Sequence, residues 1–276
     1  MSAPFCDIQL ARRLERAEGH ACAQFALARR KLFPASGAEV MEHAGAYAVF
    51  DAIGSAVTQS FGLGIFEELS AETLDAIERF FRDRWADVDL EVSPLAGVAA
   101  LSLLCERGYR PIEISNVMYR PVEEPSSGAG DGIKVRVAGP GEMQLWNTTA
   151  AKAWVYEHPE LEEFFREFGA IASAREACVC FLAEYDGQPG ASGALSIHEG
   201  VALFAGAATV PELRRRGLQA ALLQERMRYA FEHGCDLAMM AAEAGSNSQR
   251  NAERKGFRVA YTRTKWRLSP RCTTTL

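Results

Sequence analysis

Residues 204–223 read FAGAATVPELRRRGLQAALL, which is a strand pattern followed by a turn, three arginines, a glycine and a helix start. The helix carries apolar residues on one side, at Ala220, Leu223, Met227, Ala230 and Phe231. The first N–H groups of a helix have no partner inside the helix and lie at the positive end of its dipole. The segment therefore predicts an anion-binding loop between a strand and a helix.

The loop Arg214–Ala220 suits a doubly charged pyrophosphate. Gly217 has no side chain, so a ligand can approach the backbone closely. Three consecutive arginines add mobile positive charge beside the same point. The candidate coenzyme-binding residues of the loop, besides Gly217, are Arg214, Arg215, Arg216, Leu218, Gln219 and Ala220. Alone, the arginines fit a solvated charged turn equally well. The strand before them and the amphipathic helix after them favour a binding function.

At this segment the sequence resembles the GCN5-related N-acetyltransferases (GNAT), whose loop has the form Arg/Gln-x-x-Gly-x-Gly/Ala. Arg214-x-x-Gly217 matches this pattern, and Lys255-Gly256-Phe257 resembles the family's later Lys-x-Gly-Phe element. Gln219 departs from it, because the family usually has Gly or Ala there. The Gln219 side chain must therefore turn away from the phosphates or bind them. The resemblance covers roughly residues 133–268 well and the first 120 residues in outline.

The resemblance implies that acetyl-CoA is the acyl donor. It also implies that the backbone of Ala208, Thr209 and Val210 binds the pantetheine arm, in the manner of a strand added to an open sheet edge. Asn247 and Asn251, at the start of a later helix, are further candidates for coenzyme contact. Both also fit ordinary polar residues at a helix start.

Transfer of an acyl group to an amine needs a neutral amine and a route for returning a proton to the departing thiolate. The family often uses a Tyr for that proton, four residues before the Gly-Phe element, where this sequence has Ala252. Glu243, expected at the carboxyl end of a strand, is our candidate base, acting through water. Ser248 is our candidate proton donor, also through water. The structural alternative for Glu243 is a solvated carboxylate at a strand end, and that for Ser248 is a polar helix-cap or surface residue.

The chain also repeats itself. Glu106-Arg-Gly-Tyr-Arg matches Arg254-Lys-Gly-Phe-Arg, with a strand and a helix before each pentapeptide and a strand after it. We therefore predict an α/β fold of two tandem acyl-CoA N-acyltransferase-like domains, each with a mixed, mostly antiparallel sheet flanked by helices. Predicted bounds are 1–122 for a degenerate first domain, 123–132 for a Gly/Pro/Ser-rich linker and 133–276 for the acetyltransferase domain.

The first half lacks the features of the anion loop. After an expected strand over 56–65 it has Glu67 and Glu68, then Ser70, which can cap the next helix, and Glu72 in the first turn. A pyrophosphate would be repelled there and would find the N–H groups occupied. We infer that the first domain is a degenerate copy that binds no coenzyme.

For the second half we expect a strand over 133–138, helices over 140–157 and 160–173, and strands over 177–185 and 190–198. A strand over 201–210 and a helix over 217–233 follow. The remaining expected elements are a strand over 236–243, a helix over 247–255 and two terminal strands.

Composition narrows the function classes. A net charge of −6 gives no general attraction to nucleic acid or to an anionic membrane, and no apolar run approaches 18 residues. Seven scattered cysteines fit reduced thiols, and no metal-binding spacing occurs. With no secretory signal pattern at the start, we expect the cytoplasm. The oligomeric state stays open between monomer and homodimer.

Three hypotheses remain at this point. The leading one is an N-acetyltransferase acting on a primary amine of a small molecule or peptide. The second is a catalytically silent acyl-CoA sensor or interaction module, which the missing Tyr favours. A third is an interaction scaffold in which neither half binds coenzyme.

Overall fold

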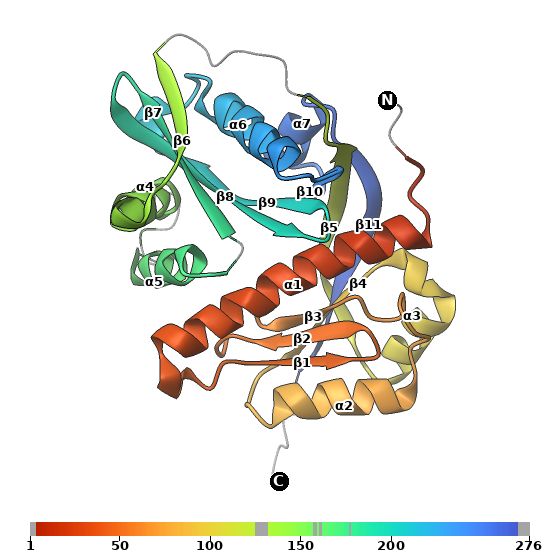
Figure 1. Ribbon diagram of the computed structural model, residues 1–276. Helices are drawn as coiled ribbons and strands as arrows, with labels where there is room; N and C mark the ends of the chain where they lie inside the picture. The colour runs from red at the N-terminus through yellow and green to blue at the C-terminus, as the bar shows by residue number, and fades with distance from the viewer. Residues whose placement is uncertain (1–3, 125–131, 157–158, 160–161, 177, 270–276) are drawn as a thin grey trace. The chain divides into compact units, whose positions relative to one another are not determined.

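A computed structural model describes residues 4–124, 132–156, 159, 162–176 and 178–269 (Figure 1). The chain forms two compact units. The middle unit contains Arg120–Met240, whereas the two-segment unit combines Pro4–Tyr119 with Ala241–Leu276. The second unit therefore takes residues from both ends of the sequence.

The two-segment unit has a mixed sheet in the order β1-β2-β3-β4-β11-β5, in which only β3 and β4 are parallel. Asp7 begins its first helix by accepting hydrogen bonds from the backbone N–H groups of Gln9 and Leu10. Its helices are α1 (Ile8–Leu32), α2 (Ala71–Arg82), α3 (Gly97–Glu106) and α7 (Asn247–Glu253), with 3₁₀ turns η1 (Pro34–Ser36) and η2 (Pro94–Ala96). Its strands are β1 (Glu39–His43), β2 (Ala46–Phe50), β3 (Gln59–Phe61), β4 (Val88–Val92), β5 (Arg110–Pro121) and β11 (Arg258–Leu268).

The last strand of the chain explains why this unit has two segments. β11 pairs antiparallel with β4, from Thr264 opposite Val92 to Leu268 opposite Val88, and also with β5. The compact units therefore do not follow chain order. Of the expected linker, residues 125–131 lie outside the described part of the chain.

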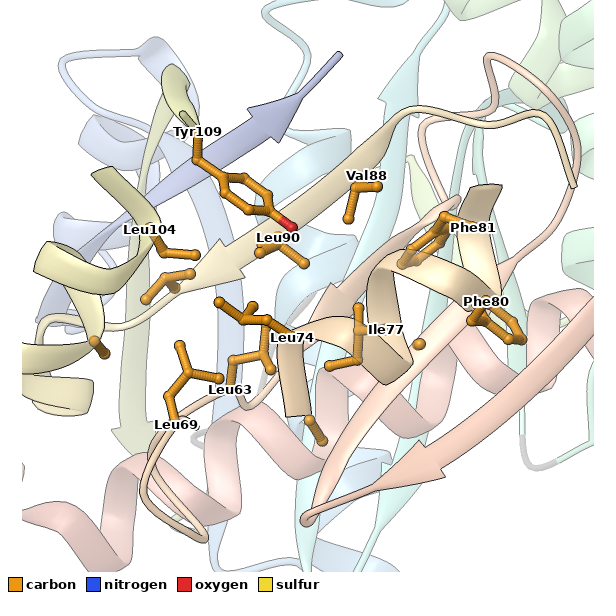
Figure 2. Packing of buried hydrophobic residues seen from close by; sticks show 14 of the residues in the cluster. Leu63, Leu69, Leu74, Ile77, Phe80, Phe81, Val88, Leu90, Leu104 and Tyr109 are labelled. Atoms are coloured by element: carbon orange, nitrogen blue, oxygen red, sulfur yellow. The ribbon is translucent and has the colours of Figure 1, made fainter. Parts of the chain in front are cut away.

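The core of the two-segment unit packs α2 and α3 against the sheet (Figure 2). Leu74, Ile77 and Phe81 of α2 are almost fully buried, as are Leu90 of β4 and Leu104 of α3. Because every residue of β4 is buried, this strand lies in the middle of the unit's sheet and not at its edge.

The middle unit has four antiparallel strands, β6 to β9, followed by β10, which pairs parallel with β9. Helix α6 covers one face of this sheet, and α4 and α5 cover the other (Figure 1). Its strands are β6 (Ile133–Val137), β7 (Cys178–Tyr185), β8 (Gln188–His198), β9 (Val201–Thr209) and β10 (Leu237–Glu243). Its helices are α4 (Met143–Val155), α5 (Glu162–Ser173) and α6 (Leu218–Glu232), with 3₁₀ turns η3 (Pro140–Glu142) and η5 (Pro211–Leu213).

Two glycines of β8 let α6 approach the sheet. A Cβ atom on Gly190 would lie 2.5 Å from Leu213 Cδ1 and 2.8 Å from Leu218 Cδ1. A Cβ atom on Gly193 would lie 2.9 Å from Leu222 Cδ2. Any larger residue at these positions would push the start of α6 away from β8.

The predicted fold class is confirmed: each unit is a mixed sheet flanked by helices. The order β3-α2-β4-α3-β5 of the first half is repeated as β9-α6-β10-α7-β11. Two element predictions were wrong. The strand expected over 56–65 is only β3, because Gly62 and Gly64 adopt positive φ angles and turn the chain. The two expected terminal strands are the single strand β11.

Candidate functional site

The predicted anion loop connects β9 to α6. After the 3₁₀ turn η5, Arg214 is extended, Arg215 has a φ of 63° and Gly217 has a φ of 87° at the cap of α6. The left-handed conformation of Gly217 is one that glycine adopts without strain. Leu218 is buried and anchors the helix start, whereas Gly217 is exposed.

The first N–H groups of α6 are available to an anion because the cap residue, Gly217, has no side chain to bind them. Helix α2 of the two-segment unit provides a contrast. There the Ser70 hydroxyl accepts a hydrogen bond from the Thr73 N–H at 3.2 Å. The pKa of Glu72 is lowered by a hydrogen bond from its own backbone and by another from Ser70. The start of α2 is therefore already neutralised by the chain itself.

A cavity of about 370 Å³ lies beside the start of α2. Its lining includes Arg12, Glu67, Glu68 and Leu69. The Arg12 Nε donates to the Ile65 carbonyl at 2.6 Å, so this cation binds the loop itself. The two carboxylates at the cavity support the inference that the first half does not bind a pyrophosphate.

The three arginines of the loop are exposed, and two of them lie against tyrosines. The guanidinium of Arg214 is 5.5 Å from the centre of the Tyr156 ring, and that of Arg216 is 5.2 Å from the Tyr185 ring. The Arg214 Nε also donates to the Thr209 carbonyl at 3.3 Å. Sequence reasoning missed both tyrosines, because nothing in their local sequence relates them to the loop.

Gln219 turns toward β9. Its Nε2 donates to the Thr209 hydroxyl at 2.8 Å. The side chain thus links the first turn of α6 to the end of β9. Of the two orientations that the sequence left open, this contact agrees with a side chain that turns away from the phosphates.

The end of β9 is the expected pantetheine-binding edge. The parallel register with β10 covers only Val201–Leu203. On the other side, Ala208 lies opposite Ser192 and Thr209 opposite Ala191 of β8. The Val210 N–H donates to the Gly190 carbonyl at 2.9 Å, and the Val210 carbonyl accepts from the Leu213 N–H. Strand addition would therefore depend mainly on Ala208 and Thr209.

The candidate catalytic residues belong to the two-segment unit. Glu243 ends β10 and is exposed, as are Asn247, Ser248 and Asn251 on α7. The cap of α7 is Ser246, whose hydroxyl accepts from the Gln249 N–H at 3.2 Å. None of the three polar residues of α7 is therefore the cap, and their exposure agrees with the other structural alternative, an ordinary surface residue.

Two further features of α7 bear on the chemistry. Ala252, where the family has its Tyr, is 3% exposed and points into the core. Gln249, which sequence reasoning did not single out, accepts from the Asn116 Nδ2 at 3.0 Å and from the Gly245 N–H at 2.7 Å. Gln249 therefore holds the loop after Glu243 against β5.

Two general features concern metals and membranes. Within the described residues, no group of three or more His, Cys, Asp or Glu side chains is placed to hold a metal ion. No helix in that part of the chain is both long enough and apolar enough to cross a membrane.

Comparison with known proteins agrees with this geometry. Residues 141–244 match the family described as acetyltransferase (GNAT) domain. A GCN5-related N-acetyltransferase from Kribbella flavida has 18% identity and a TM-score of 0.69, over 95% of this chain and 96% of that chain. One from Sphaerobacter thermophilus has 18% identity and a TM-score of 0.56, over 84% and 75%.

A tandem GNAT protein from the clavulanic acid biosynthesis pathway is similar over almost its full length. It has 11% identity and a TM-score of 0.57, over 97% of this chain and 98% of that chain. A search of curated proteins gave no significant match. Residues 141–244 thus match an acetyltransferase (GNAT) domain, and the chain as a whole shares its fold with GCN5-related N-acetyltransferases, including one of tandem architecture.

Proposed function

We propose that the protein transfers an acetyl group from acetyl-CoA to a primary amine of a small molecule or peptide. The observation that carries this proposal is the start of α6, where Gly217 leaves the first N–H groups free beside three exposed arginines. Backbone N–H groups and guanidinium groups both bind pyrophosphate oxygens, and charge-assisted bonds of this kind are the strong ones.

In the proposed reaction the neutral amine attacks the carbonyl carbon of the thioester directly. The new C–N bond forms, the C–S bond breaks, and the amine loses one proton while the thiolate gains one. Glu243 accepts the amine's proton through water, and Ser248 returns a proton through water. The proposed coenzyme contacts are the backbone of Ala208–Val210 and the loop Arg214–Ala220, and in addition Asn247 and Asn251.

The second candidate function is a silent acyl-CoA sensor. Ala252 favours it, because this side chain is buried where the family has its proton donor. The cytoplasm is the proposed compartment for either function.

Calorimetry with acetyl-CoA on the full chain, followed by thiol release with a panel of amines, tests both candidates. Binding with turnover supports the enzyme. Binding without turnover on any amine supports the sensor. Absence of acetyl-CoA binding overturns both and leaves the scaffold hypothesis.

Glu243→Gln tests the proposed base. The substitution removes the proton acceptor without changing the side-chain volume, so turnover should fall about a hundredfold or more. The dissociation constant of acetyl-CoA should stay the same, because Glu243 lies outside the coenzyme loop. Glu199→Gln, an exposed carboxylate in the β8–β9 turn, is the matched control and should keep full turnover. Equal turnover in the two variants would remove Glu243 from the mechanism.

A further inference from the structure

A buried arginine, Arg226, packs beside the residue of β9 that follows the last residue paired with β10. Arg226 of α6 is 3% exposed, and its guanidinium is 5.0 Å from the centre of the Phe204 ring. The register of β9 with β10 ends at Leu203, immediately before Phe204. Arg226 thus lies at the point where the two strands stop pairing.

The same point carries a β-bulge. Ser192 lies opposite Ala208 and Ala194 opposite Ala205, so one residue of β8 faces two residues of β9. Gly206, one of those two, has a φ of 60°. A bulge of this kind bends a strand and turns its continuation in a new direction. Here the continuation is Ala208–Thr209.

Helices on both faces of the sheet hold the β8 side of the bulge. The Arg226 Nη1 donates to the Ala194 carbonyl at 3.1 Å, and the Trp146 Nε1 donates to the Gly193 carbonyl at 3.3 Å. A Cβ atom on Gly193 would lie 3.2 Å from Arg226 Cζ, so glycine at this position makes room for the guanidinium. The bulge is therefore held by two specific donors.

The charge of Arg226 is expensive to bury. Its guanidinium contacts the carbonyls of Ala194 and Leu222 and the Phe204 ring. Burial lowers the pKa of Arg226 to about 10, and no carboxylate in the described part of the chain offsets this effect. An apolar side chain of similar volume would serve stability alone at least as well. A role in shaping the β8–β9 bulge would explain why a charged side chain is buried at this position.

We propose that Arg226 is a positioning residue that holds the β8–β9 bulge, and thereby keeps the Ala208–Thr209 backbone open to the pantetheine arm of acetyl-CoA. This inference rests on the proposed function of the same site. Arg226 acts through the conformation of β8 and β9 and does not itself contact acetyl-CoA.

The test compares Arg226→Met, Arg226→Lys and Trp146→Phe in the full chain. Arg226→Met should raise the KM for acetyl-CoA about tenfold and change kcat at saturating acetyl-CoA by less than about threefold, because the hydrogen bond that holds the bulge is lost and the binding edge is no longer positioned. Arg226→Lys keeps one donor for Ala194 and should restore most of the affinity. Trp146→Phe, which frees the other bulge carbonyl, should raise KM in the same direction.

Two further readouts separate positioning from a structural role. The urea midpoint of Arg226→Met should stay close to that of the parent, because relief of the buried charge offsets the lost hydrogen bond. Amide exchange at residues 205–209 should become faster even without acetyl-CoA. A lower midpoint with unchanged KM and unchanged exchange at 205–209 would overturn the proposal. A parent protein that binds no acetyl-CoA would refute the proposed function, while the exchange measurement still tests the bulge.

Discussion

Gly217 adopts a left-handed backbone conformation without strain and also leaves the N–H groups at the start of α6 uncovered. Its φ of 87° lies in the left-handed region, and the nearest atom to an added Cβ would be Ile133 Cδ1 at 3.4 Å. There is space for a side chain, but that side chain would be strained and would stand beside the free N–H groups of α6. Substitution here should therefore affect binding far more than folding.

Gly217→Glu should weaken acetyl-CoA binding by roughly ten- to a thousandfold, because it adds bulk and a negative charge where charge-assisted bonds form. Calorimetry measures the affinity and circular dichroism the fold. Gly234→Glu is the matched control, since Gly234 also has a positive φ and lies at the opposite end of α6. It adds the same charge and similar strain, and should bind as the parent does. Equal affinities in the two variants would contradict the assigned pyrophosphate site.

Residue by residue, the sequence predicted local features and missed long-range ones. Gly217, Ser70 and Glu72 were found because a helix start depends on its own neighbours in the chain. Tyr156, Tyr185 and Arg226 were not found. Each acquires its role from residues distant in the sequence, so local pattern could not reveal it.

At the scale of helices and strands, Gly190 of β8 sets how closely the start of α6 packs against that strand. Leu213 and Leu218, on either side of the arginine loop, both pack where a Gly190 side chain would be. The position of the loop therefore depends on a strand that contributes no side chain to it.

Gly190→Val should displace both leucines and move the start of α6. We expect a loss of about 1–3 kcal/mol in unfolding free energy, as is typical of overpacking, together with weaker acetyl-CoA binding. Urea denaturation and calorimetry measure the two effects. Gly141→Val is the matched control, because nothing lies within 4 Å of the Cβ position there and its φ is ordinary. If Gly190→Val kept the parent's stability and affinity, the close packing of α6 would not matter to the site.

A buried charge network joins α1 to β11 within the two-segment unit. The Arg263 guanidinium bonds to both carboxylate oxygens of Glu18 at 2.8 Å and lies 2.9 Å from Glu91 and 3.5 Å from Glu15. The Tyr261 hydroxyl donates to Glu15 at 2.8 Å. Burial is the main cause that raises the pKa of Glu15 above its ordinary value.

Glu15→Gln should therefore stabilise the protein at pH 7, by about 1 kcal/mol. The folded protein favours a protonated Glu15, so its ionised form costs stability above the raised folded pKa. That cost disappears below about pH 4.5, the ordinary value, where the carboxyl is protonated in both states. Urea denaturation at pH 7 and pH 4 measures the difference, which should be present at pH 7 and small at pH 4.

Glu18→Gln is the control for the Glu15→Gln variant. It breaks the two-bond contact with Arg263 and should destabilise the protein at pH 7. If Glu15→Gln destabilised the protein equally at both pH values, Glu15 would be an ionised partner of Arg263 and the interpretation would be wrong.

Helices and strands could be predicted from the sequence where a regular pattern of apolar residues extends over many positions or turn residues mark their ends. The helix α6 and strands β7 to β10 agree with the expected ranges to within a few residues, because an apolar stripe or a turn pair marks each of them. β3 was overestimated because the apolar run through Ile65 looks like a strand, while Gly62 and Gly64 bend it. The bulge of β9 was also missed, since Gly206 alone does not specify a register.

At the scale of the whole chain, the two-segment unit depends on β11 for a complete sheet. A chain that ends at residue 257 lacks this strand, which leaves β4 and β5 without the partner they share. We expect that truncation to abolish slow amide exchange in β2, β3 and β4. A chain that ends at Leu268 keeps β11 and should exchange like the full chain. Protected β2–β4 amides in the shorter chain would show that the sheet forms without β11.

The duplication was predictable, but the partner of the last strand was not. The repeated Gly-Phe and Gly-Tyr pentapeptides indicate two copies of one element order, whichever sheet each final strand joins. Both β5 and β11 read as strands that could complete either copy. The pairing of β11 with both β4 and β5, to which side-chain contacts such as Arg263 with Glu91 contribute, assigns Ala241–Leu276 to the two-segment unit.

That pairing has a consequence for biosynthesis. The ribosome makes β4 and β5 before the middle unit and β11 after it, so both strands wait for their partner while the middle unit is made. At typical translation rates the wait is roughly 10 s. Throughout that time the unpaired backbone of β4 and β5 is a template for wrong pairing, including pairing between nascent chains on one message. We therefore expect the yield of folded protein to depend on translation speed between codons 122 and 257, and on chaperones that cover exposed strands.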